Sequence, residues 1–319
     1  MNDMTDKKII AVVGATGSQG GGMVRALLDD DAFTIRALTR DPQSTKAMAL
    51  TAAGAEVVAA DLDDEESLDA AFAGAHGAFV VTNYWAPLPQ DAQQTAAQRE
   101  LAQAQAAVRA LDRAGVRHVV WSTLEDSRGR FADDAAVPDV EGYKVPHFDA
   151  KAEADRFFAA VPTTYLRTTL FYENFANSFP PRPGDDGTLT LGIPMADQPL
   201  AGIAVEDIGR TALEIFHRGD PLIGRTVSIA GDILTGDGYA AALTEALGRR
   251  VVYRPMTFDE FRAQGFPSAV EMGNMFQYYA EDAATFTGDR DLDRVRELNP
   301  GLQSFPDWLA QHGDDIPLP

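Results

Sequence analysis

Short apolar runs alternate with longer amphipathic segments through the first half of the chain. Each run is rich in valine, isoleucine, alanine or phenylalanine and ends in polar residues or glycine, which is typical of buried parallel strands followed by turns. The runs that we expect to be strands are Ile9–Val13, Thr34–Thr39, Glu56–Ala60, Ala78–Thr82, His118–Ser122 and Thr163–Thr168. The segments that we expect to be helices are Met23–Leu28, Ser44–Ala53, Glu65–Phe72, Ala92–Ala114 and His147–Ala160.

The second half of the chain has a less regular pattern. Residues 123–146 are polar and irregular, and residues 170–199 are rich in proline and glycine. The elements expected here are strands over Thr188–Leu191, Thr226–Ala230 and Val251–Tyr253, a helix over Val205–Phe216, and short helices beyond Thr235.

Strands that alternate with helices form a parallel sheet covered on both faces, and right-handed crossovers make such a sheet doubly wound. The sequence therefore predicts an α/β protein with a doubly wound parallel Rossmann sheet and a smaller, mainly helical C-terminal lobe. We expect residues 1–168 to form a dinucleotide-binding domain, with parts of residues 200–232 completing its sheet. Residues 169–319 would form the lobe that binds a substrate or an effector.

A glycine-rich turn joins the first expected strand to the first expected helix. It reads Gly14-Ala15-Thr16-Gly17-Ser18-Gln19-Gly20-Gly21, with the spacing G-x-x-G-x-x-G in place of the standard G-x-G-x-x-G. Glycine allows a tight turn in which the backbone approaches a ligand closely, and the N–H groups at a helix start bind an anionic pyrophosphate. Because the turn lies between a buried strand and a helix, we favour a dinucleotide site over a flexible surface loop.

The composition limits the classes of function. The chain has 319 residues, 45% of them hydrophobic, and a formal net charge of -21, so we expect no direct binding to nucleic acid through a basic surface. The absence of cysteine excludes disulfides, thiolate metal sites and a cysteine nucleophile, and we expect no metal site. We find no signal-peptide core and no membrane-spanning apolar run, so we expect a cytoplasmic protein without a membrane partner.

The end of the second expected strand bears on the choice of nucleotide. Enzymes that prefer NAD usually carry an acidic residue there, which accepts hydrogen bonds from the ribose 2′-hydroxyl. Here the strand ends in Thr39-Arg40, and an arginine would pair with a 2′-phosphate. Lys46 on the next helix could add positive charge, whereas Asp41 either weakens this interpretation or caps the helix. The sequence therefore predicts NADP(H) as the cofactor.

The ends of the next two strands supply further candidate residues. Asp61 follows the third strand, where it would either receive the adenine amino group or cap the next helix. Thr82, Asn83 and Tyr84 follow the fourth strand and would lie along the ribose and nicotinamide. The alternative for the aromatic residue is ordinary packing within the loop.

Short-chain reductases usually carry a Tyr-x-x-x-Lys pair on one helix face, in which the tyrosine donates a proton. In this chain the residue four before Lys151 is His147, and Tyr143 is followed four residues later by the same histidine. Three interpretations remain open. Either His147 replaces the tyrosine as the acid, or Lys151 acts alone, or Lys151 only binds the cofactor and no reaction is catalysed. Each residue taken singly could also be an ordinary surface side chain.

Several motifs, in the same order along the chain, resemble the NmrA-like group of atypical short-chain dehydrogenases, particularly its NADPH-sensing members. They extend over nearly the whole chain, at Gly14–Gly21, Leu38–Pro42, Val81–Trp85, His147–Lys151, Phe171–Asn174, Gly202–Gly209, Gly265–Pro267 and Asn274–Tyr279. The resemblance implies that Gly14 to Gln19 hold the pyrophosphate and that Arg40 to Ser44 surround the 2′-phosphate.

The same resemblance implies roles for the nucleoside ends of the cofactor. Asp61 and Leu62 would flank the adenine, Thr82 to Tyr84 would line the ribose side, and Lys151 would bind the nicotinamide ribose. The residues expected to close over the nicotinamide are Phe171, Tyr172, Glu173 and Asn174.

Two functions are consistent with these features. The first is an NADP(H)-binding regulatory protein that senses the ratio of reduced to oxidised cofactor, because a complete cofactor site accompanies a missing catalytic tyrosine. The second is an NADPH-dependent oxidoreductase of a small quinone or carbonyl substrate, assisted by His147 or Lys151, since hydride transfer to a quinone needs little acid catalysis. The expected partners are NADP(H), a small-molecule substrate in the second case, and a protein partner or a second copy of the chain in the first.

Overall fold

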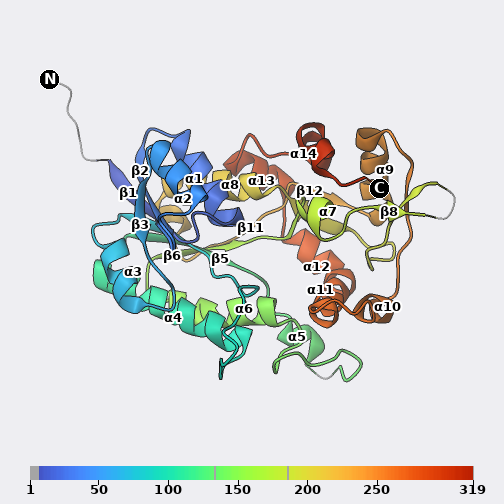
Figure 1. The fold of residues 1–319 in the computed structure, drawn as a ribbon, viewed down its shortest axis with the longest axis horizontal. Coiled ribbons are helices and arrows are strands. Elements are labelled where there is room, and N and C mark those ends of the chain that lie inside the picture. The colour runs from blue at the N-terminus through green and yellow to red at the C-terminus, as the bar shows by residue number, and fades with distance from the viewer. Residues whose placement is uncertain (1–6, 133, 185–186, 319) are drawn as a thin grey trace. The chain divides into compact units, whose positions relative to one another are not determined.

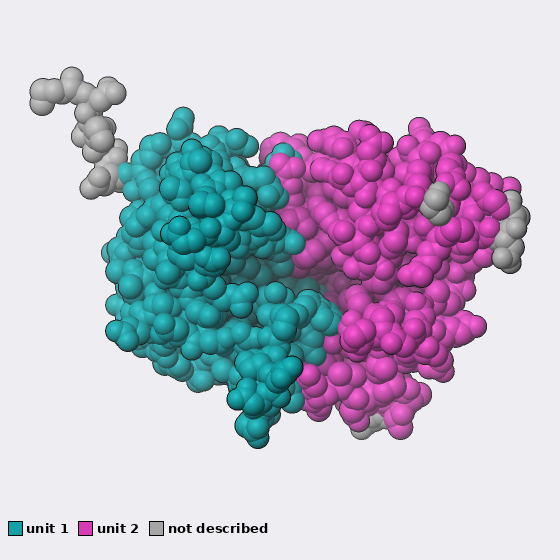
Figure 2. Space-filling model, viewed as in Figure 1, with its two compact units in different colours: residues 1–125, 150–167, 208–227 teal, residues 126–149, 168–207, 228–319 magenta. Residues whose placement is uncertain are grey.

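The computed structural model describes residues 7–132, 134–184 and 187–318 of the chain (Figure 1). The described residues form two compact units (Figure 2). Unit 1 lies within residues 1–125, 150–167 and 208–227, and unit 2 lies within residues 126–149, 168–207 and 228–319. Each unit is therefore assembled from separate parts of the chain.

Unit 1 is built around a seven-stranded sheet. Its strands are β1 (Lys8–Val12), β2 (Phe33–Thr39), β3 (Glu56–Ala59), β4 (Gly77–Val80), β5 (His118–Thr123), β6 (Thr163–Arg167) and β11 (Thr226–Ser228). They lie in the order β11-β6-β5-β4-β1-β2-β3, and the pairings among the first six strands are parallel. The order changes direction between β1 and β4, which is the switch point where doubly wound folds bind ligands. The predicted fold class is confirmed.

Helices cover both faces of this sheet. They are α1 (Ser18–Leu28), α2 (Thr45–Ala52), α3 (Glu65–Phe72), α4 (Ala96–Ala114), α6 (Pro146–Phe158) and α8 (Val205–Arg218). Helices α3, α4 and α6 lie on one face and bury a core around Phe72, Leu111 and Trp121, while α1, α2 and α8 lie on the other (Figure 1). Because β4 and β5 are buried throughout, apolar residues follow one another without alternation in Gly77–Val80 of β4 and in Val119, Val120 and Trp121 of β5.

Helices α1 and α8 approach one another at their backbones. A Cβ atom on Gly209 of α8 would lie 2.3 Å from the carbonyl group of Gly22 in α1. No side chain fits in that space, so the contact requires glycine at position 209. The backbone of α8 thus packs directly against the backbone of α1, and this contact fixes the position of α1.

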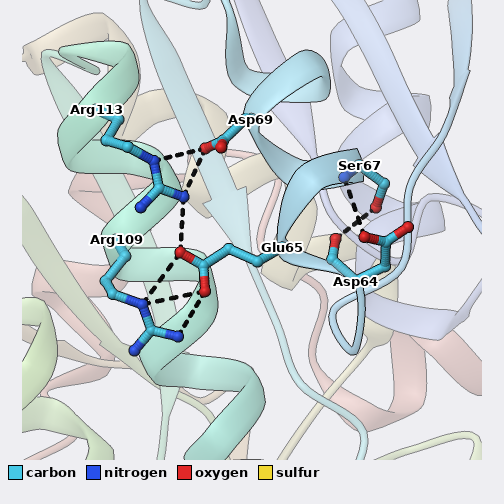
Figure 3. A network of polar contacts seen from close by, with 6 residues as sticks. All are labelled: Asp64, Glu65, Ser67, Asp69, Arg109 and Arg113. Atoms are coloured by element: carbon cyan, nitrogen blue, oxygen red, sulfur yellow. Dashed lines mark hydrogen bonds and ion pairs between the residues drawn. The ribbon is translucent and has the colours of Figure 1, made fainter.

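A surface network of ion pairs joins α3 to α4 (Figure 3). Arg109 donates to both carboxylate oxygens of Glu65, and Arg113 contacts both Glu65 and Asp69. Hydrogen bonds from Arg109 and Arg113 lower the pKa of the Glu65 carboxyl group to about 2. Because these groups are solvated, the network is expected to add little to stability and mainly to fix the pairing of the two helices.

Unit 2 contains two three-stranded sheets and most of the short helices. One sheet has the order β12 (Asp232–Leu234), β10 (Leu200–Ile203), β7 (Leu170–Phe171), and the other has the order β13 (Val251–Tyr253), β9 (Leu189–Leu191), β8 (Arg182–Pro183). The helices of unit 2 are α5 (Arg128–Phe131), α7 (Asn174–Asn177), α9 (Gly236–Leu247), α10 (Phe258–Arg262), α11 (Ala269–Glu281), α12 (Ala283–Gly288), α13 (Leu292–Leu298) and α14 (Phe305–His312). Short 3₁₀ helices lie at Asp220–Leu222 in unit 1 and at Gly313–Asp315 in unit 2.

Some element boundaries differ from the sequence-based prediction. Helix α4 begins at Ala96 rather than Ala92, because Thr95 and Gln98 form a capping box that ends the preceding loop. The sheet formed by β7, β10 and β12 was not predicted, since its strands are short and its partners lie far apart in the sequence. Within the described residues, no helix is long and apolar enough to cross a bilayer.

Candidate functional site

The glycine turn has the geometry expected of a phosphate-binding loop. Gly14 has a φ of +66°, a left-handed conformation that glycine adopts without strain. The N–H of Gly17 donates to the carbonyl of Gly14 at 2.8 Å, and α1 begins at the next residue. A Cβ atom on Gly20 would lie 2.3 Å from that same carbonyl oxygen, so a side chain there would displace the turn.

The start of α1 is suited to an anion. Its N-cap, Gly17, makes no side-chain hydrogen bond, and the first turn contains no acidic residue. No acidic side chain of this turn therefore competes with an anion for the first N–H groups and the positive end of the helix dipole. The side chain of Gln19 accepts a hydrogen bond from the Ser122 hydroxyl at 2.7 Å, which ties this turn to the end of β5. The residues present fit a pyrophosphate group.

The segment after β2 presents positive charge. Arg40 and Lys46 are both exposed, and the first turn of α2 contains no acidic residue. Ser44 is the N-cap of α2: its hydroxyl accepts from the N–H of Ala47 and donates to the carbonyl of Asp41. The carboxylate of Asp41 accepts from the N–H of Gln43 instead, so the alternative role of Asp41 as the helix cap is wrong.

The residues after β3 border an open groove. Asp61 accepts a hydrogen bond from the N–H of Asp63, and Asp64 rather than Asp61 caps α3, which removes the capping alternative for Asp61. Leu62 and Asp63 line a groove of about 500 Å³ together with Arg99 and other residues of α4. Burial raises the pKa of the Asp63 carboxyl group, but hydrogen bonds from Arg99 and Gln103 outweigh it, so the pKa is lowered.

Lys151 lies in a buried polar cluster with Thr82 and Glu100. The ammonium Nζ donates to the Thr82 hydroxyl at 2.7 Å and to its carbonyl at 3.2 Å, and it lies 3.0 Å from Oε1 of Glu100. The Thr82 hydroxyl donates to the same Glu100 oxygen at 2.6 Å. Since Lys151 is 7% exposed and Glu100 is 1% exposed, the two opposite charges neutralise one another away from water.

The two residues after Thr82 differ in exposure. Asn83 is exposed, and its side-chain oxygen accepts a hydrogen bond from the N–H of Trp85. Tyr84 is buried, and its ring packs edge-on against that of Trp85 at a centroid distance of 4.9 Å. The ring of Tyr84 therefore contributes at least to the packing of this loop.

Trp121 connects the lysine cluster to a second acid. The Nζ of Lys151 lies 5.1 Å from the centroid of the Trp121 ring, in a cation–π contact. The indole N–H of Trp121 and the hydroxyl of Thr123 both donate to Asp155, which lies one helical turn after Lys151. Burial raises the pKa of Asp155 to about 6, although these two hydrogen bonds oppose the shift.

His147 is held within unit 2 by a buried carboxylate. Its Nδ1 lies 2.5 Å from Oε1 of Glu271 on α11, and its backbone N–H donates to the same oxygen at 3.0 Å. Both residues are less than a tenth exposed. His147 is therefore not an ordinary surface side chain, because its ring is oriented by a paired acid.

The side chains of Tyr172 and Glu173 have structural contacts within unit 2. The ring of Tyr172 is fully buried and lies 5.1 Å from the ring of Phe305. The carboxylate of Glu173 accepts from the N–H of Val205 at the start of α8, and burial raises the pKa of this acid. Phe171 and Asn174 are partly exposed.

The sequence analysis missed Glu100 and Glu271. Each lies on the buried face of its helix, Glu100 in line with Ala97, Ala104 and Ala107 of α4. A single charge inside an apolar helical stripe is the signal that could have identified them, because an acid is rarely buried without a partner.

Sequence comparison relates most of the chain to one family. The model of the NmrA-like family matches residues 6–307. The chain is 32% identical over 286 residues to the NmrA-like family domain-containing oxidoreductase FrzB of Cladobotryum sp, a match that covers 85% of this chain and 83% of that protein.

Solved structures show the same fold. NmrA, a negative transcriptional regulator, in complex with NADP superposes with a TM-score of 0.76 at 23% identity, covering 96% of this chain and 95% of that one. The same regulator has been crystallised with NAD, with a TM-score of 0.77. The Citrobacter sp. triphenylmethane reductase complexed with NADP(H) has a TM-score of 0.71 at 22% identity, covering 96% of this chain and 99% of that one.

Proposed function

The chain belongs to the NmrA-like family, and from that membership we propose that it binds NADP(H) and acts as a sensor of the cofactor's oxidation state. The observation that carries the binding proposal is the glycine turn, where Gly14 and Gly20 bring the backbone close and α1 starts without an acidic residue. Proteins of the same fold, a regulator and a reductase, have been crystallised with NADP or NADP(H).

Different residues at the carboxyl ends of the strands would bind different parts of the cofactor. The turn from Gly14 to Gln19 would hold the pyrophosphate, and Arg40, Ser44 and Lys46 would hold the 2′-phosphate. The residues proposed for the two nucleosides are Asp61 and Leu62 for adenine, and Thr82, Asn83, Tyr84 and Lys151 for the nicotinamide ribose. The residues proposed to close over the nicotinamide are Phe171, Tyr172, Glu173 and Asn174. When bound, NADPH would supply a hydride.

The sensor role rests on what the lysine does in this structure. Lys151 makes three polar contacts, to both oxygens of Thr82 and to Glu100, and these hold its ammonium in place. The usual tyrosine acid is absent four residues earlier. A lysine engaged in this way maintains the shape and charge of a binding site, which suits binding without turnover.

The experiment is a titration with NADPH, NADP+ and NADH by calorimetry, combined with hydrogen exchange in the presence of each nucleotide. We expect NADPH and NADP+ to bind, to produce different exchange patterns in the loops, and to show no steady consumption of NADPH. Binding that leaves the two exchange patterns identical would contradict the sensor role while leaving the cofactor assignment intact.

One observation favours a second function, an NADPH-dependent oxidoreductase of a small quinone or carbonyl compound. The Glu271 carboxylate orients His147, as expected for a histidine that donates a proton, and FrzB is named an oxidoreductase. Steady NADPH oxidation with a panel of quinones and aldehydes would establish this function in place of the sensor.

A further inference from the structure

Glu100 is a buried carboxylate with an unusual set of contacts. Its Oε1 accepts from the Thr82 hydroxyl and pairs with Lys151, whereas its Oε2 has no hydrogen-bond partner among the described residues. The side chain is 1% exposed. A carboxylate in this position is costly to bury, so it is retained here by the charge that it neutralises.

The position of this pair in the sheet shows which part of a dinucleotide it would affect. Thr82 follows β4, and Lys151 lies on α6 after β5, so both belong to the half of the sheet beyond β1 that does not contain β2 and β3. Doubly wound folds bind one mononucleotide over each half. With the 2′-phosphate site at the end of β2, the nicotinamide half falls over β4 and β5.

The nicotinamide ring carries a positive charge when oxidised and none when reduced. A lone lysine in this half of the site would therefore disfavour NADP+ relative to NADPH by repulsion between like charges. In this protein the charge of Lys151 is balanced by Glu100 at 3.0 Å, so the oxidised ring meets a neutral pair.

We propose that Glu100 sets the preference of this protein between NADP+ and NADPH by neutralising Lys151, an inference that rests on the proposed binding of NADP(H). Glu100 is then a specificity-determining residue that acts through Lys151. Without it, the site would favour the reduced cofactor and would respond poorly to a change in the ratio.

The test compares dissociation constants for NADPH and NADP+ in matched variants by calorimetry. Glu100→Gln removes one negative charge and should shift the affinity ratio toward NADPH by about tenfold. Lys151→Met leaves the carboxylate alone and should shift the ratio in the opposite direction. The double variant should return the ratio to the wild-type value even if both affinities are lower, and Glu66→Gln on the exposed face of α3 controls for net charge.

The outcomes separate this inference from the function on which it rests. If Glu100→Gln weakens both nucleotides equally, Glu100 is only structural and the inference is wrong. If Glu100→Gln does not fold, Lys151→Met still tests the inference. An affinity ratio that is unchanged in Lys151→Met would show that the inference is wrong. Failure of the wild-type protein to bind either nucleotide would instead refute the proposed function, and this inference with it.

Discussion

Oε1 of Glu271 accepts two hydrogen bonds from His147, one from the ring Nδ1 at 2.5 Å and one from the backbone N–H at 3.0 Å. The residues are 124 positions apart in the sequence, yet both are buried in unit 2. The carboxylate therefore fixes both the first turn of α6 and the orientation of the imidazole ring. Whether this arrangement serves stability alone or also proton transfer can be decided by substitution.

His147→Ala should destabilise the protein without weakening its binding of NADPH. Removing the ring takes away the side-chain partner of the buried Glu271, so we expect the free energy of unfolding to fall by about 1–3 kcal/mol. Urea denaturation and calorimetry measure the two quantities. Arg294→Ala, which removes an exposed pair with Asp291, is the control and should change stability little.

The same variant tests the oxidoreductase alternative. If His147 is the acid of a reductase, its removal should reduce turnover by roughly 10²–10⁴-fold, the usual share of acid–base catalysis. A measurable wild-type rate that is lost in this variant would rule against the sensor.

Arg40→Ala should weaken NADPH and spare NADH. A charged hydrogen bond to a 2′-phosphate is worth about 1.5–3 kcal/mol, so the dissociation constant for NADPH should rise by about one to two powers of ten. Arg250→Ala, at an exposed arginine before β13, controls for the loss of one positive charge. Equal losses for both nucleotides would show that Arg40 does not contact the 2′-phosphate.

The glycines of the turn should differ in what their substitution damages. A Cβ on Gly17 would lie 3.2 Å from the carbonyl oxygen of Gly14, and the extended backbone at Gly17 suits any residue. Gly17→Val should therefore fold and lose nucleotide binding, because its side chain stands where the pyrophosphate would approach. Gly20→Val should fold poorly, since a Cβ there would meet the backbone at 2.3 Å.

Circular dichroism and nucleotide titration of the two variants test this distinction. A folded Gly17→Val protein that binds NADPH normally would place the cofactor elsewhere.

The buried His118 should make the protein less stable in mild acid. Burial lowers the pKa of its ring to about 4, although the nearby negative charge of Asp220 opposes this shift. The unfolded chain, with a histidine pKa of about 6.5, then binds a proton that the folded chain excludes, so this contribution to stability is lost as the pH falls below 6.5. Asp155 acts in the opposite direction, because its raised pKa of about 6 favours protonation of the folded state.

A variant isolates the histidine from the other titrating groups. The unfolding free energy of His118→Gln should fall less than that of wild type between pH 7 and pH 5, as measured by urea denaturation at several pH values. Parallel curves for the two proteins would show that the ring is protonated as easily in the folded state as in the unfolded one.

The central sheet could be predicted because each of its first six strands is an apolar run long enough to be recognised alone. β13 was likewise predicted at Val251–Tyr253. In contrast, β7 has only two residues, and β10 and β12 read Leu-Ala-Gly-Ile and Asp-Ile-Leu, without the run of β-branched residues that identifies a strand alone. These strands form a sheet through pairing with one another. Such strands are determined by tertiary contacts that no local pattern records.

The residues of the candidate site also fall into those that local sequence identifies and those that depend on tertiary contacts. The glycine turn and the end of β2 depend on local sequence, and the structure gives both a geometry that suits the predicted cofactor. Glu100 and Glu271 pair with Lys151 and His147, each more than 50 positions away, so neither ion pair could be predicted from neighbouring residues. The roles assigned to the individual cofactor-binding residues remain predictions for the experiments above.

The main-chain contact of Gly209 with Gly22 has a consequence for how this protein can vary. A methyl group at position 209 would push α8 away from α1. A displacement of about 1 Å is enough to weaken a ligand site, because its groups must be held in a defined geometry. Glycine at position 209 is thus required as strictly as in the turn itself, although it lies almost two hundred residues further along the chain. In a library that varies every residue, only glycine should be tolerated at position 209. The reason is the packing of α8 on α1 and not a contact with a ligand.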